Sequence, residues 1–392
     1  MSSRVDLNLL TEIKKYGTVN VEKCFNCGNC TAICPLAETG ETFPRRLIRY
    51  AQLGLKDRLL SSKELWLCYY CGECTQTCPK EADPGEFMAA ARRYATASYD
   101  PLGLAKLLYT SPILSTIVLL LLPLLIAMVV FTSHGPMDTG TLKLFEFIPV
   151  TTIHNLGIVA MAVVALTGLF GALNMIRQVR KENPLVQTPG LRLNWLGALW
   201  NALVVEGVSQ QRYRRDCQAS SSEQTRWYAQ KWFVHATMVW GFLGLLAATA
   251  LDFGLDLLGV KAAGTWVPLW YPVRLLGTVA GLFLLYGASA AAIRRFRKVD
   301  EASAVSAGSD WVFLLLLWLT GVSGFVLEIA LYLPNPGLWA YWSLLFHISM
   351  AGELLLLLPF TKFAHVIYRT VALYFHVLKP VPSNELARVG AD

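Results

Sequence analysis

The sequence has few charged residues and long stretches without any. Asp, Glu, Lys and Arg make up 16% of the 392 residues and 54% are hydrophobic, while the mean hydropathy is +0.44. This composition excludes a soluble globular protein and indicates one that crosses a membrane several times. The formal net charge of +7 does not indicate a nucleic-acid partner, because the bases lie in loops beside apolar segments.

Cysteine is almost absent after residue 78. Eight of the nine cysteines lie between Cys24 and Cys78, and we interpret the ninth, Cys217, as a free thiol. Residues 1–23 carry acids and bases throughout and have no apolar central region, unlike a secretory signal. We therefore expect the cysteine-rich region to stay in the reducing cytoplasm, where such spacing indicates metal ligation rather than disulfides.

The cysteines form two copies of one motif. CFNCGNCTAICP at 24–35 returns as CYYCGECTQTCP at 68–79. In this pattern three thiolates bind one cubane iron–sulfur cluster and the fourth binds the other cluster. We predict two [4Fe-4S] clusters, held by two sets of four residues: Cys24, Cys27, Cys30 and Cys78, and Cys68, Cys71, Cys74 and Cys34. Two zinc sites are the alternative, but these usually show paired CxxC motifs.

The cysteine motifs belong to a predicted helical domain over residues 1–100. The apolar residues of 42–60 recur with helical spacing, so Phe43, Leu47, Ile48, Tyr50, Ala51 and Leu55 can share one face. A second helix is expected after Pro84. With so few residues, the domain would rely on its clusters for part of its stability.

Residues 101–376 are predicted to form a transmembrane domain, with a tail at 377–392. Six spans are long enough to cross a hydrocarbon layer of about 30 Å: 112–132, 151–176, 232–252, 271–293, 311–333 and 340–368. The fold class is therefore all-α. Within the loop 177–231, NWLGALWNALVVEG is expected to lie in the membrane interface.

Basic residues predict the orientation of these spans. Nine Lys and Arg lie in 177–231 and four in 294–310, whereas 133–150 and 253–270 carry one each. The positive-inside rule then places both termini and the cysteine-rich domain in the cytoplasm of a bacterial cell, with the spans in its inner membrane.

Four histidines lie at matched depths of the predicted spans. His347 and His365 are 18 residues apart, which is five helical turns and about 27 Å of rise on a continuous helix. His154 begins the second span at the outer face, and His235 begins the third at the inner face. We predict two b haems, the outer one between His154 and His347 and the inner one between His235 and His365.

Other interpretations of these polar residues stay open. A single intramembrane histidine can be a hydrogen-bonded interior residue or a proton-relay group, and one haem rather than two is a further alternative. We interpret His134 and His376 as ordinary interfacial residues. Glu353, between the two histidines of the sixth span, is a candidate proton or quinone contact, while Glu328 and Asp252 are weaker candidates. A helix–helix hydrogen bond or a position beside a haem propionate is the alternative for each.

The two cysteine motifs followed by these histidines resemble a fusion of the C and E subunits of heterodisulfide reductase. More specifically, the chain resembles the C subunits of quinone-interacting membrane-bound oxidoreductase complexes. The interval from His347 to His365 is similar to that of nitrate reductase gamma-type subunits, which bind two haems from one helix. Those subunits commonly draw both partner histidines from one other helix, whereas His154 and His235 lie on two spans.

The resemblance implies a membrane protein that passes electrons between menaquinol and cytoplasmic flavin and iron–sulfur subunits, with adenylylsulfate reductase as the downstream partner. We expect the quinone site on the outer side. The alternatives are a heterodisulfide or sulfite-reducing respiratory complex and a non-catalytic iron–sulfur anchor. A transporter is disfavoured because the membrane half has no clear internal repeat. No residue stands out as a catalytic nucleophile or general base.

Overall fold

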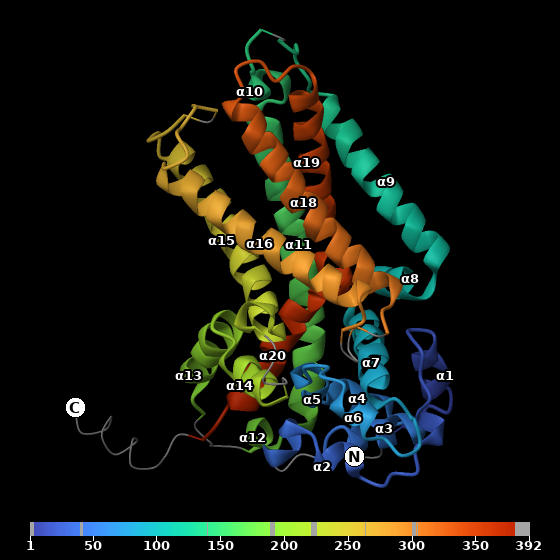
Figure 1. The fold of residues 1–392 in the computed structure, drawn as a ribbon. Helices are drawn as coiled ribbons and strands as arrows, with labels where there is room; N and C mark the ends of the chain where they lie inside the picture. Colours follow the sequence, from blue (N-terminus) through green and yellow to red (C-terminus); the bar gives the residue numbers. More distant parts are fainter. Residues whose placement is uncertain are drawn as a thin grey trace, which may run out of the picture.

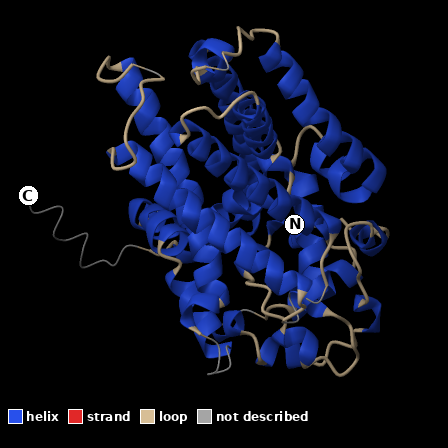
Figure 2. Cartoon of the chain, turned by 45° about the horizontal axis from the view of Figure 1, so that its top comes forward, coloured by secondary structure: helices blue, strands red, loops and turns tan. Residues whose placement is uncertain are grey.

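The computed structural model describes residues 4–39, 42–138, 140–188, 193–220, 226–262, 264–299, 303 and 305–380. In this part of the chain the regular structure is helical, and the one bridge between extended residues joins Leu193 to Pro380 (Figure 2). The predicted all-α class is confirmed. Cys217 falls in a helix whose side chains from 216 to 220 lie outside the described set.

The N-terminal domain consists of short helices that hold the two cysteine motifs at one end of the molecule (Figure 1). Its elements are α1 (Leu9–Lys14), η1 (Val21–Lys23), α2 (Asn29–Ala32), η2 (Pro35–Thr39), α3 (Arg45–Gln52), α4 (Lys56–Ser61), α5 (Glu64–Leu67), α6 (Glu73–Gln76) and α7 (Pro84–Tyr99). The predicted helix after Pro84 is α7, and Pro84 occupies its first turn, where a missing N–H costs nothing.

The single helix expected over 42–60 is wrong, because two helices meet at Gly54. Gly54 has a φ of +69°, and a Cβ there would lie 2.3 Å from the Asp6 carbonyl oxygen. Only glycine accommodates both the left-handed backbone and this close approach. The predicted apolar face is nevertheless formed, since Phe43, Leu47 and Ile48 are buried.

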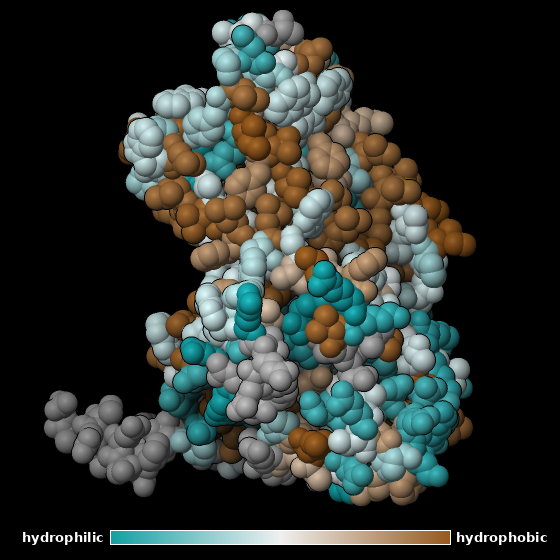
Figure 3. Space-filling model, viewed as in Figure 1, coloured by the Kyte–Doolittle hydropathy of each residue, from teal (hydrophilic) through white to brown (hydrophobic). Residues whose placement is uncertain are grey.

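Five helices are long and apolar enough to cross a membrane: α9 (Pro112–Phe131), α11 (Val150–Glu182), α15 (Lys231–Leu257), α16 (Pro272–Phe296) and α18 (Gly308–Tyr332). They correspond to the first five predicted spans. Helix α8 (Leu104–Thr110) leads into α9, and α10 (Leu144–Phe147) lies at the end far from the N-terminal domain (Figure 1). Figure 3 shows a broad hydrophobic region across this half, with more hydrophilic side chains at its far end, and mainly hydrophilic side chains over the other half.

The continuous sixth helix predicted over 340–368 is wrong. The structure has α19 (Trp339–Leu356), then two short turns, η5 (Leu358–Phe360) and η6 (Lys362–Ala364), and then α20 (His365–Val377). Pro359 cannot donate a backbone hydrogen bond and clashes with the preceding turn, and Thr361 is extended, with φ −113° and ψ −171°. His347 and His365 therefore lie on different helices.

The segment between α11 and α15 lies beside α20 and the N-terminal domain (Figure 1). It contains α12 (Pro184–Gln187), α13 (Trp195–Trp200), η3 (Asn201–Val208, wound as a π-helix), α14 (Gln211–Ser220) and η4 (Trp227–Ala229). Leu196 is 82% exposed and Trp200 64% exposed, which fits the predicted interfacial position of this stretch.

One hydrophobic core joins the N-terminal domain to the helices that follow it. Trp66 and Tyr99 are buried in the same cluster as Met175 of α11 and Leu373 of α20. The Tyr368 ring lies 5.0 Å from both the Trp66 and the Tyr99 ring centroids. The cysteine motifs are thus fixed relative to the membrane helices by packing rather than by a linker.

Candidate functional site

The two cysteine motifs fold in the same way. Gly28 and Gly72 both have a φ of +96°, and the residue two positions earlier, Asn26 or Tyr70, also has a positive φ. Each glycine is followed by one turn of helix, α2 or α6. The repeated left-handed residues bend both loops so that backbone N–H groups turn inward, for example from Tyr70 to Sγ of Cys68 at 3.3 Å.

One group of thiols surrounds Cys30. Burial raises the pKa of the Cys30 thiol, and the neighbouring Cys24, Cys27 and Cys78 raise it further. These are the four residues expected to share the first cluster. Sγ of Cys78 accepts a bond from the Ala82 N–H at 3.4 Å, an interaction of the kind that tunes cluster potentials.

The second group brings Cys34 to the other motif. The pKa of the Cys34 thiol is raised to about 12, mainly by burial and in smaller part by the neighbouring Cys68 and Cys71. Burial also raises the pKa of the Cys74 thiol, and the neighbouring Cys68 and Cys71 add to this shift. These four thiols form the second predicted set. A buried thiol with a raised pKa is a poor ligand by itself, so metal binding must supply the free energy of deprotonation.

The thiol groups do not form a mononuclear metal site. Across the described ranges, no three Cys, His, Asp or Glu side chains lie close enough to hold one ion. Zinc needs four such ligands around one centre, whereas each thiolate of a cubane binds a different iron and stands further from its neighbours. The described thiols therefore lack the close arrangement that a mononuclear zinc site needs.

His235 and His365 lie close together at the junction of α15 and α20, with their rings tilted by 56° to each other. Their ring centroids are 6.3 Å apart. A metal–imidazole bond of about 2 Å, with a ring nitrogen about 1 Å from its centroid, would place two axial rings about 6 Å apart. Nδ1 of His235 donates to Oε1 of Gln210 at 2.9 Å, and Nδ1 of His365 donates to the Lys362 carbonyl at 2.7 Å.

Since each Nδ1 is engaged by its hydrogen-bond partner, the Nε2 atom of each ring, for which no hydrogen bond is found among the described residues, is the one that could bind a metal. Partners of this kind fix the orientation of an imidazole ligand and raise its basicity. The donor set and spacing fit one iron with an imidazole on each side, as a low-spin haem requires. Gln210 was missed in the sequence because it lies 25 residues from His235. The Lys362 carbonyl was missed because the sequence predicted a continuous helix where η6 precedes α20.

The outer histidines are not brought together by a described contact. Nδ1 of His347 lies 2.9 Å from Oγ of Ser323, and its ring lies against Gly324 of α18. The His154 ring instead meets the edge of Phe253 on α15 at 4.8 Å. The outer pair thus remains a prediction from the sequence.

The acidic candidates differ in their surroundings. Glu353 is 1% exposed, and within the described structure its Oε1 has no hydrogen-bond partner. Glu328 accepts a bond from Thr278 at 2.7 Å, and Asp252 pairs with Lys261 at 2.6 Å. The latter two are thus explained by local pairing, while Glu353 is not.

The remaining histidines have ordinary surroundings. His134 stacks on Phe131 with ring centroids 4.1 Å apart, and Nε2 of His376 lies 2.7 Å from a guanidinium nitrogen of Arg212. These contacts agree with their interpretation as interfacial residues.

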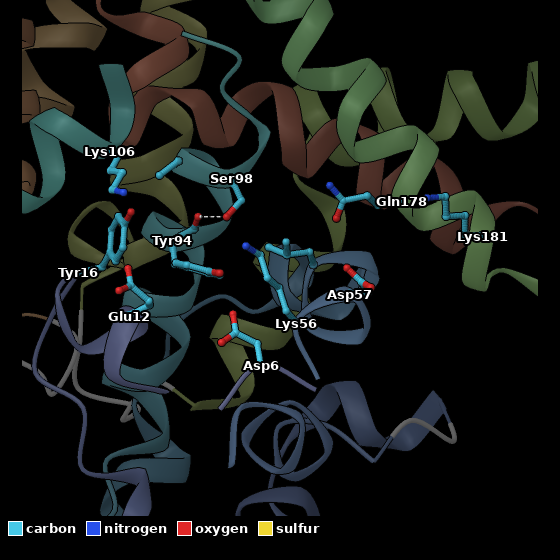
Figure 4. A pocket seen from close by; sticks show the side chains of 12 residues that line it. Asp6, Glu12, Tyr16, Lys56, Asp57, Tyr94, Ser98, Lys106, Gln178 and Lys181 are labelled. Carbon is cyan, nitrogen blue, oxygen red and sulfur yellow. Dashed lines mark hydrogen bonds between the residues drawn. The ribbon is translucent and has the colours of Figure 1, made fainter. Parts of the chain in front are cut away.

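A cavity of about 540 Å³ lies at the junction of α1, α4, α7, α8 and α11. Figure 4 shows charged side chains of both signs around it, including Lys56, Lys106 and Asp57. The described residues that line it include no cysteine or histidine. It is therefore separate from the candidate redox groups.

Two family models match the chain. One, described as a 4Fe-4S dicluster domain, matches residues 20–82; the other, described as citrate utilization protein B, matches residues 101–382, more than half of the chain. Fold and matches together define a multi-pass membrane protein with a 4Fe-4S dicluster domain. The chain belongs to the citrate utilization protein B family.

Among curated proteins, the chain is similar to parts of heterodisulfide reductases. It is 41% identical over 88 residues to an Archaeoglobus profundus protein that is named as like the C subunit of heterodisulfide reductase, covering 22% of this chain and 47% of that protein. It is 38% identical over 63 residues to the C subunit of the H(2):CoB-CoM heterodisulfide,ferredoxin reductase of Methanothermobacter thermautotrophicus, covering 16% and 34%. The chain therefore spans less than half the length of these two relatives.

A third relative is of another kind. The chain is 26% identical over 156 residues, 36% of this chain and 58% of the relative, to the E subunit of the dihydromethanophenazine:CoB--CoM heterodisulfide reductase of Methanosarcina mazei. Similarity to both C and E subunits supports the expected fusion of two subunit types. No solved structure matches the chain significantly.

Proposed function

We propose that this protein is the membrane electron-transfer subunit of a respiratory complex, connecting menaquinol to cytoplasmic flavin and iron–sulfur subunits through two b haems and two [4Fe-4S] clusters. The observation that carries the proposal is the His235–His365 pair, whose ring spacing of 6.3 Å fits an axially bound haem iron. Ala364 and Tyr368, on either side of His365 in the chain, belong to the hydrophobic core against which Cys24, Cys34 and Cys68 pack. Electrons could then pass between membrane and cytoplasm inside one chain.

The chain's own residues would hold and tune these groups. Cys24, Cys27, Cys30 and Cys78 would hold one cluster, and Cys68, Cys71, Cys74 and Cys34 the other. Haems and clusters carry single electrons, which allows a two-electron quinol to be matched to a flavin. The outer haem would use His347 and His154, of which His347 is already oriented by Ser323.

Glu353 is the proposed proton or quinone contact. It is buried on α19, and Oε1 has no partner among the residues that the structure describes. A carboxyl group at membrane depth that lacks a structural partner is suited to exchange protons with a quinol. Replacing Glu353 with Gln should slow haem reduction by a quinol and leave reduction by dithionite unchanged.

The partner subunits are proposed from the resemblance. A quinone-interacting complex that serves adenylylsulfate reductase is the first candidate, with the spans in a bacterial inner membrane and the cysteine motifs in the cytoplasm. The similarity to C and E subunits leaves a heterodisulfide-reducing complex as the close alternative.

A second candidate comes from the family model that covers residues 101–382. Its description connects the family to citrate utilization, so the cytoplasmic partner could be an enzyme of that process, with electrons flowing toward the quinone. Co-purification separates the candidates: adenylylsulfate reductase supports the first, and a flavoprotein that oxidises a carboxylic acid supports the second.

The proposal is tested by a redox-difference spectrum of the purified complex. We expect two b haems per chain, at least one reduced by a menaquinol analogue before dithionite is added. His365→Ala should remove one haem, whereas His134→Ala, at an exposed position, should remove none. Absence of haem, or haems that respond only to dithionite, would leave an iron–sulfur membrane anchor instead.

A further inference from the structure

The two cysteine motifs have the same backbone but opposite surroundings. In the first motif Phe25 is 59% exposed and Cys27 is exposed. In the second, the equivalent of Phe25 is Tyr69, which lies between the guanidinium of Arg369, 4.6 Å from its ring centroid, and the stacked ring of Tyr213 at 4.9 Å. Both covering residues belong to the helices that follow the N-terminal domain.

Two arginines from different parts of the chain hold the backbone that leads into the second motif. Arg369 of α20 donates to the carbonyl of Trp66 at 2.8 Å, with Leu67 and Cys68 carbonyls within 3.5 Å. Arg92 of α7 donates to the Leu65 carbonyl at 2.8 Å and also to that of Cys68. A planar guanidinium with several donors fixes such a backbone more rigidly than a single hydrogen bond does.

The side chains that cover the second motif continue to the inner histidines. Tyr69 stacks on Tyr213 with an interplanar angle of 22°. Tyr213 in turn meets the edge of His235 at 5.4 Å, and the His235 ring lies 6.3 Å from the His365 ring. Arg369 lies one turn after His365 on α20. A packed series of rings therefore connects Cys68 to the inner histidine pair.

We propose that the Cys68 motif exchanges electrons directly with the His235–His365 site, through contacts positioned by Tyr69, Tyr213 and Arg369, and that the Cys24 motif is the outward end. This inference rests on the proposed function. The step transfers one electron, oxidising ferrous haem iron to ferric and reducing the cluster by one electron, without a proton or a change in bonds. The exposed Cys24 motif then passes the electron to a partner protein.

Arg369 should also set the reduction potentials of the cluster and of the haem that meet at this contact. Its positive charge stabilises the reduced, more negative state of any redox group nearby, and net charge is a main determinant of cluster potentials. In Arg369→Gln, we expect the potentials of one cluster, followed by electron paramagnetic resonance, and of one haem, followed optically, to fall together.

Arg45 provides the matched control. Its guanidinium lies against Gly28 of the first motif, 3.2 Å from the position a Cβ would occupy. Arg45→Gln should lower the potential of the other cluster and leave both haems unchanged. A haem that shifts with Arg45 and not with Arg369 would overturn the order of the two motifs.

Two further variants, compared by their reduction kinetics, keep the test valid if Arg369→Gln folds poorly. Tyr69→Leu removes the stacked ring, and Phe25→Leu changes the equivalent residue of the first motif. After mixing the complex with a menaquinol analogue, Tyr69→Leu should delay bleaching of both clusters relative to haem reduction, while Phe25→Leu should not delay the cluster held by Cys68, Cys71, Cys74 and Cys34. Equal delays in both variants would contradict the inference. A complex without haem would instead refute the proposed function, whatever the clusters do.

Discussion

Gln210 orients a proposed haem ligand from outside the iron's coordination sphere. It is buried and accepts the Nδ1 proton of His235 at 2.9 Å. Gln210→Met keeps the side-chain length and removes that acceptor, so the imidazole loses its fixed orientation. We expect about ten- to hundredfold weaker retention of one haem, measured by haem content after dilution into detergent. Ser323→Ala, which acts on His347, should affect the other haem.

Glu86 makes stability depend on pH. Burial raises its pKa to about 6 from an ordinary 4.5; Asp310 adds to the shift, while Arg93, Lys362 and Arg295 oppose it. Because the folded state holds the proton more tightly, stability falls as pH rises through this interval and the loss is complete above about pH 6. Glu86→Gln should therefore stabilise the protein by up to about 2 kcal/mol at pH 7 and by nothing below pH 4.5. An equal gain at both pH values in denaturant titrations would contradict this account.

Helices α15 and α16 approach closely where glycine removes the side chain. A Cβ at Gly241 would lie 2.5 Å from the Leu284 backbone nitrogen and 2.7 Å from the Ala280 carbonyl oxygen. Since backbone atoms cannot move aside, Gly241→Ala must separate the helices, at a cost of about 1–3 kcal/mol. Gly254, on the same helix, has nothing within 4 Å of its Cβ position. Gly254→Ala should therefore not lower the unfolding midpoint and should raise it slightly, because alanine favours a helix over glycine.

Among the elements, those encoded by local patterns could be predicted from the sequence. The cysteine spacing specifies loops that fold alike, and apolar runs specify five spans. The breaks at Gly54 and Pro359 were missed because hydropathy continues across both. A residue distant in sequence stabilises the chain at each break. The Asp6 N–H donates to the Gly54 carbonyl, and beside Pro359 the side chain of Lys362 forms an ion pair with Asp310 at 2.7 Å. Such pairs leave no local signal.

At the scale of the whole molecule, Asp310 connects the N-terminal domain to the membrane helices. It is 6% exposed and lies within 3.6 Å of Arg93 from α7, Arg295 from α16 and Lys362. Asp310→Asn would leave three cations without their shared counter-charge, so we expect a loss of about 3 kcal/mol and faster proteolysis between α7 and α8.

A second ion pair between the same two parts serves as the control. Arg58 of α4 contacts Glu182 of α11 at 2.6 Å, but the side chains are 42% and 32% exposed. Solvent screens such pairs, so Glu182→Gln should cost less than about 1 kcal/mol. If both variants were equally destabilised in urea titrations, burial would not be the reason for the importance of Asp310.

Helix α20, the last helix of the described residues, has a consequence for the order of assembly. Tyr368 and Leu373 of α20 complete the hydrophobic core that surrounds Trp66 and Tyr99, although about 300 residues separate the two regions. During synthesis, the N-terminal domain therefore emerges with an open side that stays open until α20 has been made. Membrane insertion of the intervening helices must precede its completion, so a chain interrupted before α20 would leave the cysteine motifs accessible to solvent and oxidants.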